Sequence, residues 1–297
     1  MVDIILRTST RYMLLERAIK DIANQTYKEW NIIVINDGGD KQKIHQILAK
    51  HNITSFKYLE TKQQGLQRAI NLGAKAVSSE FVVVHDDDDT WNPSFLSATI
   101  DFLQQDPNRM GVISQTVKVY EKIQQNTVSS QKKILYNPNL VGVISFCDML
   151  KHNQFPPISF VYRSKVYNKI GYFDESLEVL EDWEFCIRFL SKYDIYIIPK
   201  PLAFYHIRID NEDLPVVFQN TITHKRGVHL TYDTIIRNKY LREDLAKKQF
   251  GIGIMMNVLK YSDSKLTKKI KLLLRNIDHN IYTSLPKKHY IKSNGSR

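Results

Sequence analysis

The sequence predicts an α/β fold, a mostly parallel sheet with helices on both of its faces. Two observations in the 297-residue chain favour this fold class. Short runs rich in Ile and Val alternate with amphipathic segments through the first half, at the spacing of strand–helix–strand units. Polar clusters directly follow several of these runs. The apolar fraction of 43% and the charged fraction of 25% are ordinary for a globular protein.

The elements of the first half follow from these runs. Expected strands occupy 3–7, 31–36, 56–60 and 81–85. Expected helices occupy 13–24, 41–51, 66–77 and 93–104, with Pro93 in the first turn of the last one. Right-handed crossovers bring the carboxyl ends of parallel strands to one edge. We therefore expect three polar clusters to meet there, at 8–11, 36–40 and 86–89.

The second half has a less regular pattern. Strand-like runs occur at 111–114, 116–120, 159–162, 195–198 and 203–207, with a polar loop expected at 124–133. Short helices are expected at 165–170 and 183–192, and longer ones at 216–239, 242–261 and 266–281. These patterns predict two regions, a sheet-bearing domain at 1–212 and a helical extension at 213–297.

Basic residues are concentrated in the extension. Residues 215–297 hold 17 Lys and Arg against 5 Asp and Glu, whereas the first 214 residues hold 25 and 26. Such a basic region could bind nucleic acid, anionic lipid headgroups or an acidic partner protein. Because neither interleaved aromatic residues nor a recognised nucleic-acid motif accompanies the charge, we expect no nucleic-acid partner.

The segment 266–281 has an amphipathic pattern. Leu266, Ile270 and Leu273 lie on one helical stripe, and lysines flank it. Such a helix can lie in an anionic membrane interface. Alternatively, the stripe packs on the preceding domain and the lysines remain in water.

Cysteine usage and hydropathy predict the compartment. Cys147 and Cys186 lie far apart without metal-type spacing, as expected of reduced thiols in the cytosol. We see no signal peptide and no apolar run near the roughly 20 residues that span a bilayer. We expect a cytoplasmic protein, at most peripheral on the inner face of the membrane.

Four consecutive carboxylates, Asp86 to Asp89, follow the apolar run 81–84. Open α/β sheets bind ligands at the carboxyl ends of their strands. Like charges this close repel one another, and a divalent cation relieves the repulsion. Hard oxygen ligands favour Mg²⁺ or Mn²⁺ over zinc. The alternative is a solvated acidic turn or a helix N-cap.

Several segments in a fixed order extend this interpretation. They are 4–8, 24–27, 33–38, 65–73, 85–93, 171–175 and 181–183. Together they resemble the corresponding segments of family 2 glycosyltransferases with the GT-A fold, over about residues 2–208. The resemblance implies an inverting, metal-dependent enzyme that transfers a sugar from a nucleotide-sugar, with Mn²⁺ or Mg²⁺ as cofactor.

Within the acidic run, the resemblance implies separate roles. Asp88 would ligate the metal directly, and Asp86 would contact the ribose, or the metal through water. Asp87 would help to bind the nucleotide-sugar, although a four-acid run permits more than one register. His206 would supply a late metal or phosphate contact. Its alternative is a structural role beside a strand.

Four further residues are assigned to the nucleotide-sugar. Thr8 and Arg11 lie in the first polar cluster, and Arg68 would lie on a helix face directed at the pyrophosphate. For the two arginines, the alternative is a solvated cation. Asp37 is assigned to uracil-type recognition, which implies a UDP-sugar, and its alternative is a helix cap or an Asx turn.

Asp182 is the candidate catalytic base, with Glu181 as its supporting neighbour. Inverting sugar transfer needs a carboxylate near the acceptor hydroxyl to remove its proton. The alternative for Asp182 is the N-cap of a helix that begins at Trp183, and both roles can hold together.

Departures from the family pattern narrow the expected activity. Residues 7–11 replace the commoner Pro-Thr-Tyr-Asn start, and the Gln-x-x-Arg-Trp motif of processive synthases is missing. We therefore expect transfer of one sugar per encounter, to a glycan or lipid-linked acceptor in polysaccharide biosynthesis. Two other functions stay open: a nucleotide-sugar-binding module without transfer, and a nucleotidyltransferase. The second lacks the expected early Gly-rich phosphate loop.

Overall fold

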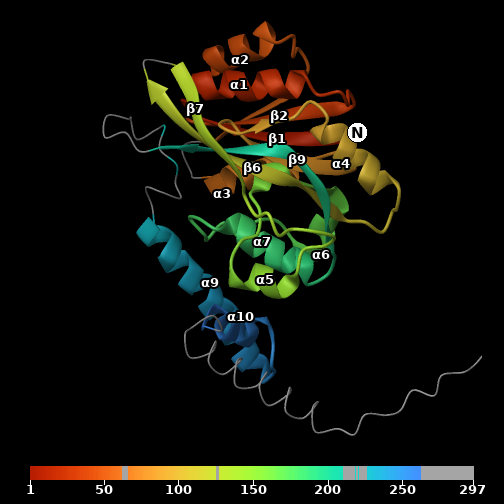
Figure 1. The fold of residues 1–297 in the computed structure, drawn as a ribbon, viewed down its shortest axis with the longest axis vertical. Helices are drawn as coiled ribbons and strands as arrows, with labels where there is room; N and C mark the ends of the chain where they lie inside the picture. Colours follow the sequence, from red (N-terminus) through yellow and green to blue (C-terminus); the bar gives the residue numbers. More distant parts are fainter. Residues whose placement is uncertain (62–65, 125–126, 210–217, 219, 221–225, 262–297) are drawn as a thin grey trace, which may run out of the picture.

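The computed structural model describes residues 1–61, 66–124, 127–209, 218, 220 and 226–261. A large twisted sheet forms the centre of the molecule, and helices cover both of its faces (Figure 1). The two C-terminal helices lie beyond one end of the sheet and its covering helices. The second of them contacts the short helix at 146–151. The α/β fold class predicted from the sequence is confirmed.

The N-terminal half of the sheet is parallel. Its strands are β1 (Val2–Thr8), β2 (Trp30–Asp37), β3 (Lys57–Thr61) and β4 (Phe81–Asp86). They lie in the order β3-β2-β1-β4, and each begins and ends within two residues of its predicted bounds. Buried parallel strands are apolar along their whole length, which is why the sequence shows them clearly.

The second half of the sheet has mixed directions. Its strands are β5 (Thr90–Trp91), β6 (Gly111–Gln124), β7 (Thr127–Leu135), β8 (Phe160–Arg163) and β9 (Ile195–Arg208). The short β8 runs antiparallel between β4 and β6, while β9 runs parallel to β6 and carries β5 at its far edge. The pairing of β6 with β9 brings the C-terminal end of β9 alongside the end of β6.

Two apolar cores lie on opposite faces of this sheet. One face is covered by α1 (Tyr12–Ala23), α2 (Lys41–Lys50) and α4 (Phe95–Gln104). The other is covered by α3 (Leu66–Lys75), α5 (Phe146–Lys151), α6 (Tyr167–Ile170) and α7 (Glu181–Leu190). Single turns of 3₁₀ helix occupy Pro157–Ser159 and Ser164–Val166. Successive residues of β1 enter opposite cores, Ile4 the first and Ile5 the second.

Three local predictions are wrong. The polar segment 124–133, predicted as a loop, forms most of β7, an exposed strand that pairs with β6 through its backbone. The two pairs of short strands at 111–120 and 195–207 are single long strands with a register shift near Gln115. Helix α4 begins at Phe95 with Ser94 in the cap position, because the Pro93 carbonyl accepts a hydrogen bond from the Thr26 amide.

The C-terminal helices are α9 (Arg226–Lys247) and α10 (Ile252–Tyr261). The break predicted at 239–242 is wrong, since the chain turns at Lys248, which has a φ of 50°. Arg237 of α9 ties the helices to the body: its guanidinium donates to the carbonyls of Leu150, Lys151 and Met256, at 2.7 to 3.2 Å.

Two predictions fall largely outside the described residues. The predicted helix at 266–281 lies there, as does the proposed boundary between residues 212 and 213. Within the described residues, none of the helices has the length and apolar character needed to cross a membrane.

Packing of α3 on the sheet gives the first testable prediction. A Cβ on Gly73 would lie 2.5 Å from the Ile5 Cγ2 and 3.2 Å from the Ile35 Cδ1. We expect Gly73→Ala to lower the free energy of unfolding by about 1–3 kcal/mol, because the core must shift to admit the methyl group. Urea unfolding followed by circular dichroism measures the difference.

Gly227→Ala in α9 is the matched control, because a Cβ there meets no atom within 4 Å. It should raise the free energy of unfolding by up to about 1 kcal/mol through helix propensity. Equal effects of the two substitutions would contradict the close approach of α3 to β1 and β2.

Candidate functional site

The predicted polar clusters meet at the carboxyl ends of β1, β2 and β4. Thr8 pairs in register with Asn36, and the Thr8 hydroxyl donates to Asp87 Oδ2 at 2.9 Å. A Cβ on Gly39 would lie 2.0 Å from the Ser9 carbonyl oxygen, so only glycine fits where the loop after β2 touches the loop after β1. The sequence prediction that 8–11, 36–40 and 86–89 converge is confirmed.

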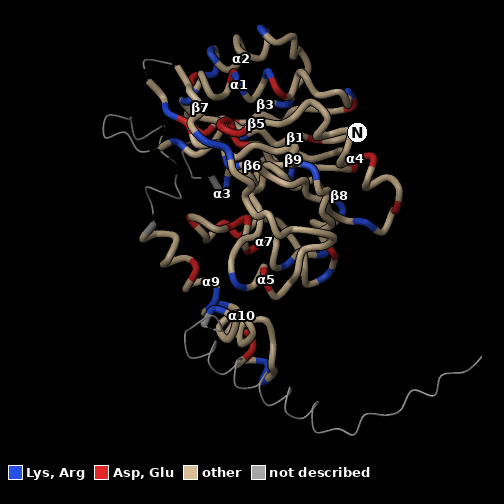
Figure 2. Tube along the Cα trace, in the orientation of Figure 1, with Lys and Arg blue, Asp and Glu red and all other residues tan. Residues whose placement is uncertain are grey.

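Arginines surround the acidic run. Arg7 forms a two-pronged ion pair with Asp86, its Nε and Nη2 donating to the two carboxylate oxygens at 2.7 and 2.9 Å. Arg11 pairs with Asp87 and Asp88, and Arg208 at the end of β9 donates to Asp88 Oδ2 at 2.5 Å. Figure 2 shows acidic and basic positions gathered around β5 and the neighbouring strand ends.

These arginines determine the protonation of Asp88. Burial alone would raise the pKa of the Asp88 carboxyl, but the charges of Arg11 and Arg208 outweigh burial and hold its pKa well below the usual range. Asp88 is therefore ionised at any physiological pH.

The arginines compensate the carboxylate charges of Asp87 and Asp89 less well than that of Asp88. Burial and the nearby Asp88 charge raise the pKa of Asp87 to about 6, although Arg11 opposes them. Burial, followed by the charges of Asp88 and Asp86, raises the pKa of Asp89 well above its usual value. Burial thus disfavours the ionised forms of Asp87 and Asp89, and a cation bound nearby would favour those forms.

His206 supports the acidic run from β9. Its backbone amide donates to Asp89 Oδ1 at 3.0 Å, its Nδ1 is hydrogen-bonded to Glu121 at 2.7 Å and its Nε2 to the Thr90 hydroxyl at 2.8 Å. Both ring nitrogens therefore have partners within the protein. A metal contact would require one of these bonds to break, and the assignment of His206 as a metal ligand stays a prediction.

Two residues that the sequence did not single out complete this support. Arg17 of α1 donates to the Asp88 carbonyl at 2.6 Å and to Glu121 of β6 at 2.9 Å. In the sequence, Arg17 has the pattern of a surface cation on an amphipathic helix. That pattern does not indicate this role, because its partners are 71 and 104 residues away in the chain.

The donor set fits a hard divalent cation. The described residues contain no ready-made group of three or more His, Cys, Asp or Glu side chains around a cation position. Mg²⁺ and Mn²⁺ need fewer, since one or two carboxylates and substrate phosphates usually hold them. Arg11 and Arg208 both bond Asp88 Oδ2, which leaves Oδ1 as the oxygen that no described residue is seen to bind. Asp86 has 29% of its side chain exposed.

The candidate base lies close to this cluster. Arg7, which binds Asp86, also reaches Glu181 Oε1 at 3.4 Å. Helix α7 begins at Glu181, preceded by Leu180 in the left-handed conformation, so Asp182 lies inside the first turn. The alternative reading of Asp182 as the N-cap of a helix that begins at Trp183 is wrong.

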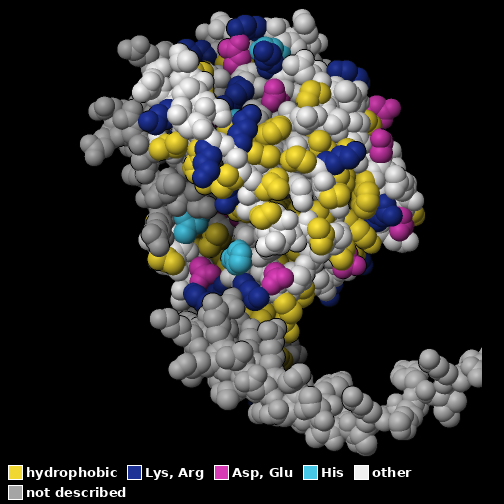
Figure 3. Space-filling view, in the orientation of Figure 1, with side chains coloured by type: hydrophobic (Ala, Val, Ile, Leu, Met, Phe, Trp, Pro, Cys, Tyr) yellow, Lys and Arg dark blue, Asp and Glu magenta, His cyan; other side chains and the backbone are white. Residues whose placement is uncertain are grey.

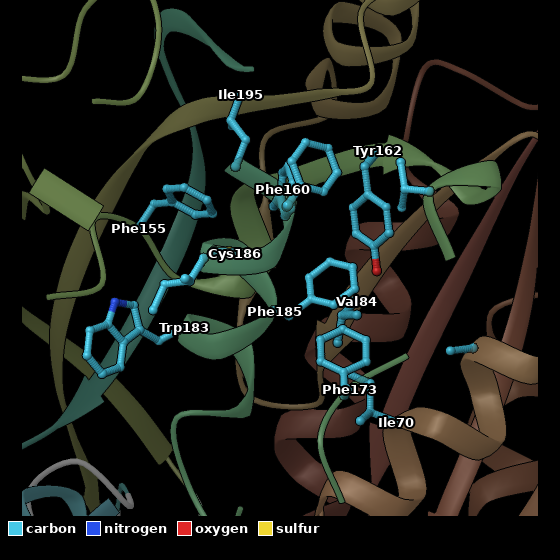
Figure 4. Close-up of a cluster of buried hydrophobic side chains, with 14 of the residues drawn as sticks. Ile70, Val84, Phe155, Phe160, Tyr162, Phe173, Trp183, Phe185, Cys186 and Ile195 are labelled. Atoms are coloured by element: carbon cyan, nitrogen blue, oxygen red, sulfur yellow. The ribbon is translucent and has the colours of Figure 1, made fainter. Parts of the chain in front are cut away.

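The environment of Asp182 raises its pKa to about 7. Burial is the largest cause, and the charge of Glu181 adds to it, while the Trp183 amide and Arg7 oppose them. The Asn153 Nδ2 donates to Asp182 Oδ2 at 2.7 Å. Asp182 and Glu181 line a small cavity whose other walls include Arg7 and a group of apolar side chains. Figure 4 shows that group, with Phe185 of α7 among Phe155, Phe160, Tyr162 and Phe173.

Two further residues assigned to the nucleotide-sugar lie on β2 and α3. Asp37 ends β2 and accepts a hydrogen bond from the Thr61 hydroxyl at the end of β3. Arg68 is exposed on α3, and the described part of the chain gives it no ion pair. Their roles toward a nucleotide-sugar stay predictions.

The family profile described as Glycosyl transferase family 2 matches residues 3–185, more than half of the chain. The chain belongs to this family. Among curated relatives of this glycosyltransferase, YwdF of Bacillus subtilis is 26% identical over 204 residues, which cover 67% of this chain and 71% of YwdF. The glycosyltransferase RT0329 of Rickettsia typhi is 24% identical over 196 residues, 66% of this chain and 60% of RT0329.

Solved structures show the same fold. Residues 1–349 of TarS from S. aureus superpose with a TM-score of 0.57 at 17% identity, covering 89% of this chain and 73% of that one. The mannosyltransferase PcManGT of Pyrobaculum calidifontis superposes with a TM-score of 0.58 at 14% identity, covering 96% and 81%. The predicted GT-A fold is confirmed, and the chain is a transferase of family 2.

The raised pKa of Asp182 predicts how stability depends on pH. The folded protein holds this proton up to about pH 7, whereas an unfolded chain releases it near pH 3.9. Stability from this group therefore falls as pH rises between the two values, by at most about 1.4 kcal/mol for each pH unit. We expect Asp182→Asn to be more stable than wild type at pH 8, and the gain to shrink at pH 5, in urea unfolding.

Asp174→Asn is the control of opposite sign. Hydrogen bonds from Lys239 and Ser176 outweigh burial and lower the pKa of Asp174 to about 2. Its contribution is present above the unfolded pKa and is lost as pH falls toward 2. Asp174→Asn should therefore lose stability at pH 8. A loss in both variants at pH 8 would contradict the raised pKa of Asp182.

Proposed function

We propose that this family 2 glycosyltransferase moves one sugar, with inversion, from a nucleotide-sugar to a glycan or lipid-linked acceptor. One observation carries the proposal: Arg7 contacts both Asp86 of the acidic run and Glu181, the neighbour of Asp182. The carboxylates suited to a cation and the candidate base therefore belong to one charge cluster at the carboxyl edge of the sheet.

The donor would bind along this edge. TarS has been solved with UDP-GlcNAc, and PcManGT with GDP-Man and Mn²⁺. Both support a nucleotide-sugar as the ligand class, and they differ in the base. We favour a UDP-sugar, with Asp37 next to the base, Thr8 and Asp87 beside the sugar nucleotide, and Arg11 and Arg68 toward the pyrophosphate.

A divalent cation would be held by Asp88 through Oδ1 and by Asp86, with His206 as a further ligand. When bound there, Mn²⁺ or Mg²⁺ would supply positive charge opposite the negative charge that develops on the leaving diphosphate. Arg11 and Arg208 keep Asp88 ionised, because they stabilise its carboxylate form.

Asp182 would act as the general base. The acceptor oxygen forms a bond to the anomeric carbon while the carbon–oxygen bond to the diphosphate breaks, and its electron pair leaves with the nucleoside diphosphate. The hydroxyl proton passes to the Asp182 carboxylate. A pKa near 7 suits this transfer at neutral pH. Glu181 contributes by raising that pKa and by holding Arg7.

The cellular setting is a separate part of the proposal. We infer a cytoplasmic enzyme, with the basic segment 266–281 available to an anionic membrane surface that carries a lipid-linked acceptor. The high positive charge of residues 215–297 supports this inference.

Product release tests the reaction class. We expect one donor from a panel of UDP- and GDP-sugars to release nucleoside diphosphate slowly with Mn²⁺ and not with EDTA, since water can replace the acceptor. Coupled detection of the diphosphate measures the rate. Pyrophosphate as product would indicate a nucleotidyltransferase, and nucleotide binding without any release would indicate a binding module.

Two variants separate binding from chemistry. Asp182→Asn should lower the transfer rate by about 10²–10⁴-fold and leave UDP binding unchanged, because only the proton acceptor is lost. Asp88→Ala should abolish the effect of Mn²⁺ on UDP binding in calorimetry. Asp101→Asn, on the exposed side of α4, is the control and should behave as wild type. Full transfer by Asp182→Asn would contradict the assigned base.

A further inference from the structure

Glu121 is a buried charge near the C-terminal end of β6. Figure 3 shows charged side chains of both signs spread over the outside of the molecule, where water solvates them. Glu121 differs from these groups, because only 1% of the residue is exposed. A buried carboxylate is unfavourable unless positive groups and hydrogen bonds compensate it. The partners of Glu121 therefore indicate what this charge holds in place.

One partner of Glu121 reaches the backbone of the acidic run. Arg17 Nη1 donates to Glu121 Oε2 at 2.9 Å, and Arg17 Nη2 donates to the Asp88 carbonyl oxygen at 2.6 Å. The guanidinium group thus bridges β6 and the residue that we assign to the cation. Because the donors of a guanidinium group have a fixed planar arrangement, the position of Glu121 limits where the Asp88 backbone can lie.

The second partner of Glu121 reaches the residue after the same run. His206 Nδ1 is hydrogen-bonded to Glu121 Oε2 at 2.7 Å, and His206 Nε2 to the Thr90 hydroxyl at 2.8 Å. A carboxylate paired with an arginine is ionised and only accepts hydrogen bonds, so we assign the ring proton to Nδ1. In a neutral imidazole, Nε2 then keeps the lone pair that a metal ligand needs.

Both carboxylate oxygens of Glu121 are already used within the protein. Its Oε2 accepts from Arg17 and His206, and its Oε1 accepts from Arg17 Nη2 at 3.4 Å. The sheet holds its backbone as well, because Glu121 pairs with Arg208 of β9 and its carbonyl accepts from the Ile209 amide at 2.9 Å. Glu121 is therefore suited to hold the groups that support the acidic run and not to bind the cation itself.

We propose that Glu121 is a positioning residue for the divalent cation. It holds the Asp88 backbone through Arg17, and it orients His206 so that Nε2 points to Thr90, directly after the acidic run. The inference rests on the proposed function, because the cation is part of that proposal. It makes the affinity for Mn²⁺ depend on a buried carboxylate of another strand, outside the acidic run.

Manganese binding in the presence of UDP tests this role. Glu121→Gln keeps the size of the side chain and removes the charge that Arg17 and His206 share. We expect its dissociation constant for Mn²⁺ to be about 10–100-fold higher than that of wild type, the usual loss when a partner of a metal ligand is replaced. The free-ion signal in electron paramagnetic resonance measures this constant on the full-length proteins.

Glu184→Gln is the matched control. Glu184 is also buried, but it binds Arg188 and Tyr240 on the other side of the molecule's second core. This variant should lose stability in urea unfolding, as Glu121→Gln should, and should bind Mn²⁺ as wild type does. An equal loss of Mn²⁺ affinity in both variants would indicate general damage and would overturn the role of Glu121.

The double variant tests whether Glu121 acts through Arg17. Arg17→Gln alone should also weaken Mn²⁺ binding, because the Asp88 carbonyl loses its donor. Glu121→Gln combined with Arg17→Gln should bind Mn²⁺ within about 3-fold of Glu121→Gln alone, since both changes break one connection. Single effects that multiply in the double variant would overturn this connection.

The outcomes for wild type separate this inference from the proposed function. Unchanged Mn²⁺ affinity in Glu121→Gln, while wild type binds the ion with UDP, would overturn the positioning role and leave the proposed function intact. Failure of wild type to bind Mn²⁺ with UDP would instead contradict the cation of the proposed function, and the positioning role would be overturned with it.

Discussion

Charge compensation of the buried carboxylates is the interaction on which the rest of the site depends. Arg7 comes from β1, Arg11 from the loop after β1 and Arg208 from the end of β9, and together they bind Asp86, Asp87 and Asp88. Removing one partner from a buried ion pair leaves an uncompensated charge that costs several kcal/mol. The carboxyl ends of β1, β4 and β9 must therefore lie together, and the long pairing of β9 with β6 places Arg208 there.

The same compensation would suit the anionic, metal-bound ligand that we propose for this site. Asp88 remains ionised because two guanidinium groups share one of its oxygens, while Asp87 and Asp89 have raised pKa values. A divalent cation would relieve the repulsion among the acids. The phosphates of a donor would then offer Arg11 an alternative partner. The opposing charges that stabilise the folded protein are thus the groups that we propose for binding the nucleotide-sugar and its metal ion.

The sequence predicted the first half of the fold and the convergence of the three polar clusters. Strands such as β4 are apolar along their length because both faces are buried, and the clusters that follow them meet because parallel strands end at one edge. β7 was missed because its polar side chains face solvent and its backbone alone pairs with β6. The alternative role of Asp182 as an N-cap is wrong because α7 begins at Glu181, after Leu180 in the left-handed conformation, which Leu rarely adopts.

Contacts between distant segments were not predictable from local patterns. Arg17 and Glu121 are 104 residues apart, and Asn153 is 29 residues from Asp182. Nothing in the spacing of these residues indicates that they meet, since their approach depends on the register of β6 and on the packing of α5 against α7. The helices α9 and α10 join the rest of the protein in the same way, through contacts with α5.

The most direct test of the central claim is a crystal structure with UDP and Mn²⁺, with anomalous scattering to locate the ion. We expect the manganese peak beside Asp88 and Asp86, with Arg11 displaced toward the phosphates. UDP bound at this edge without a manganese peak near either carboxylate would contradict the metal-dependent mechanism.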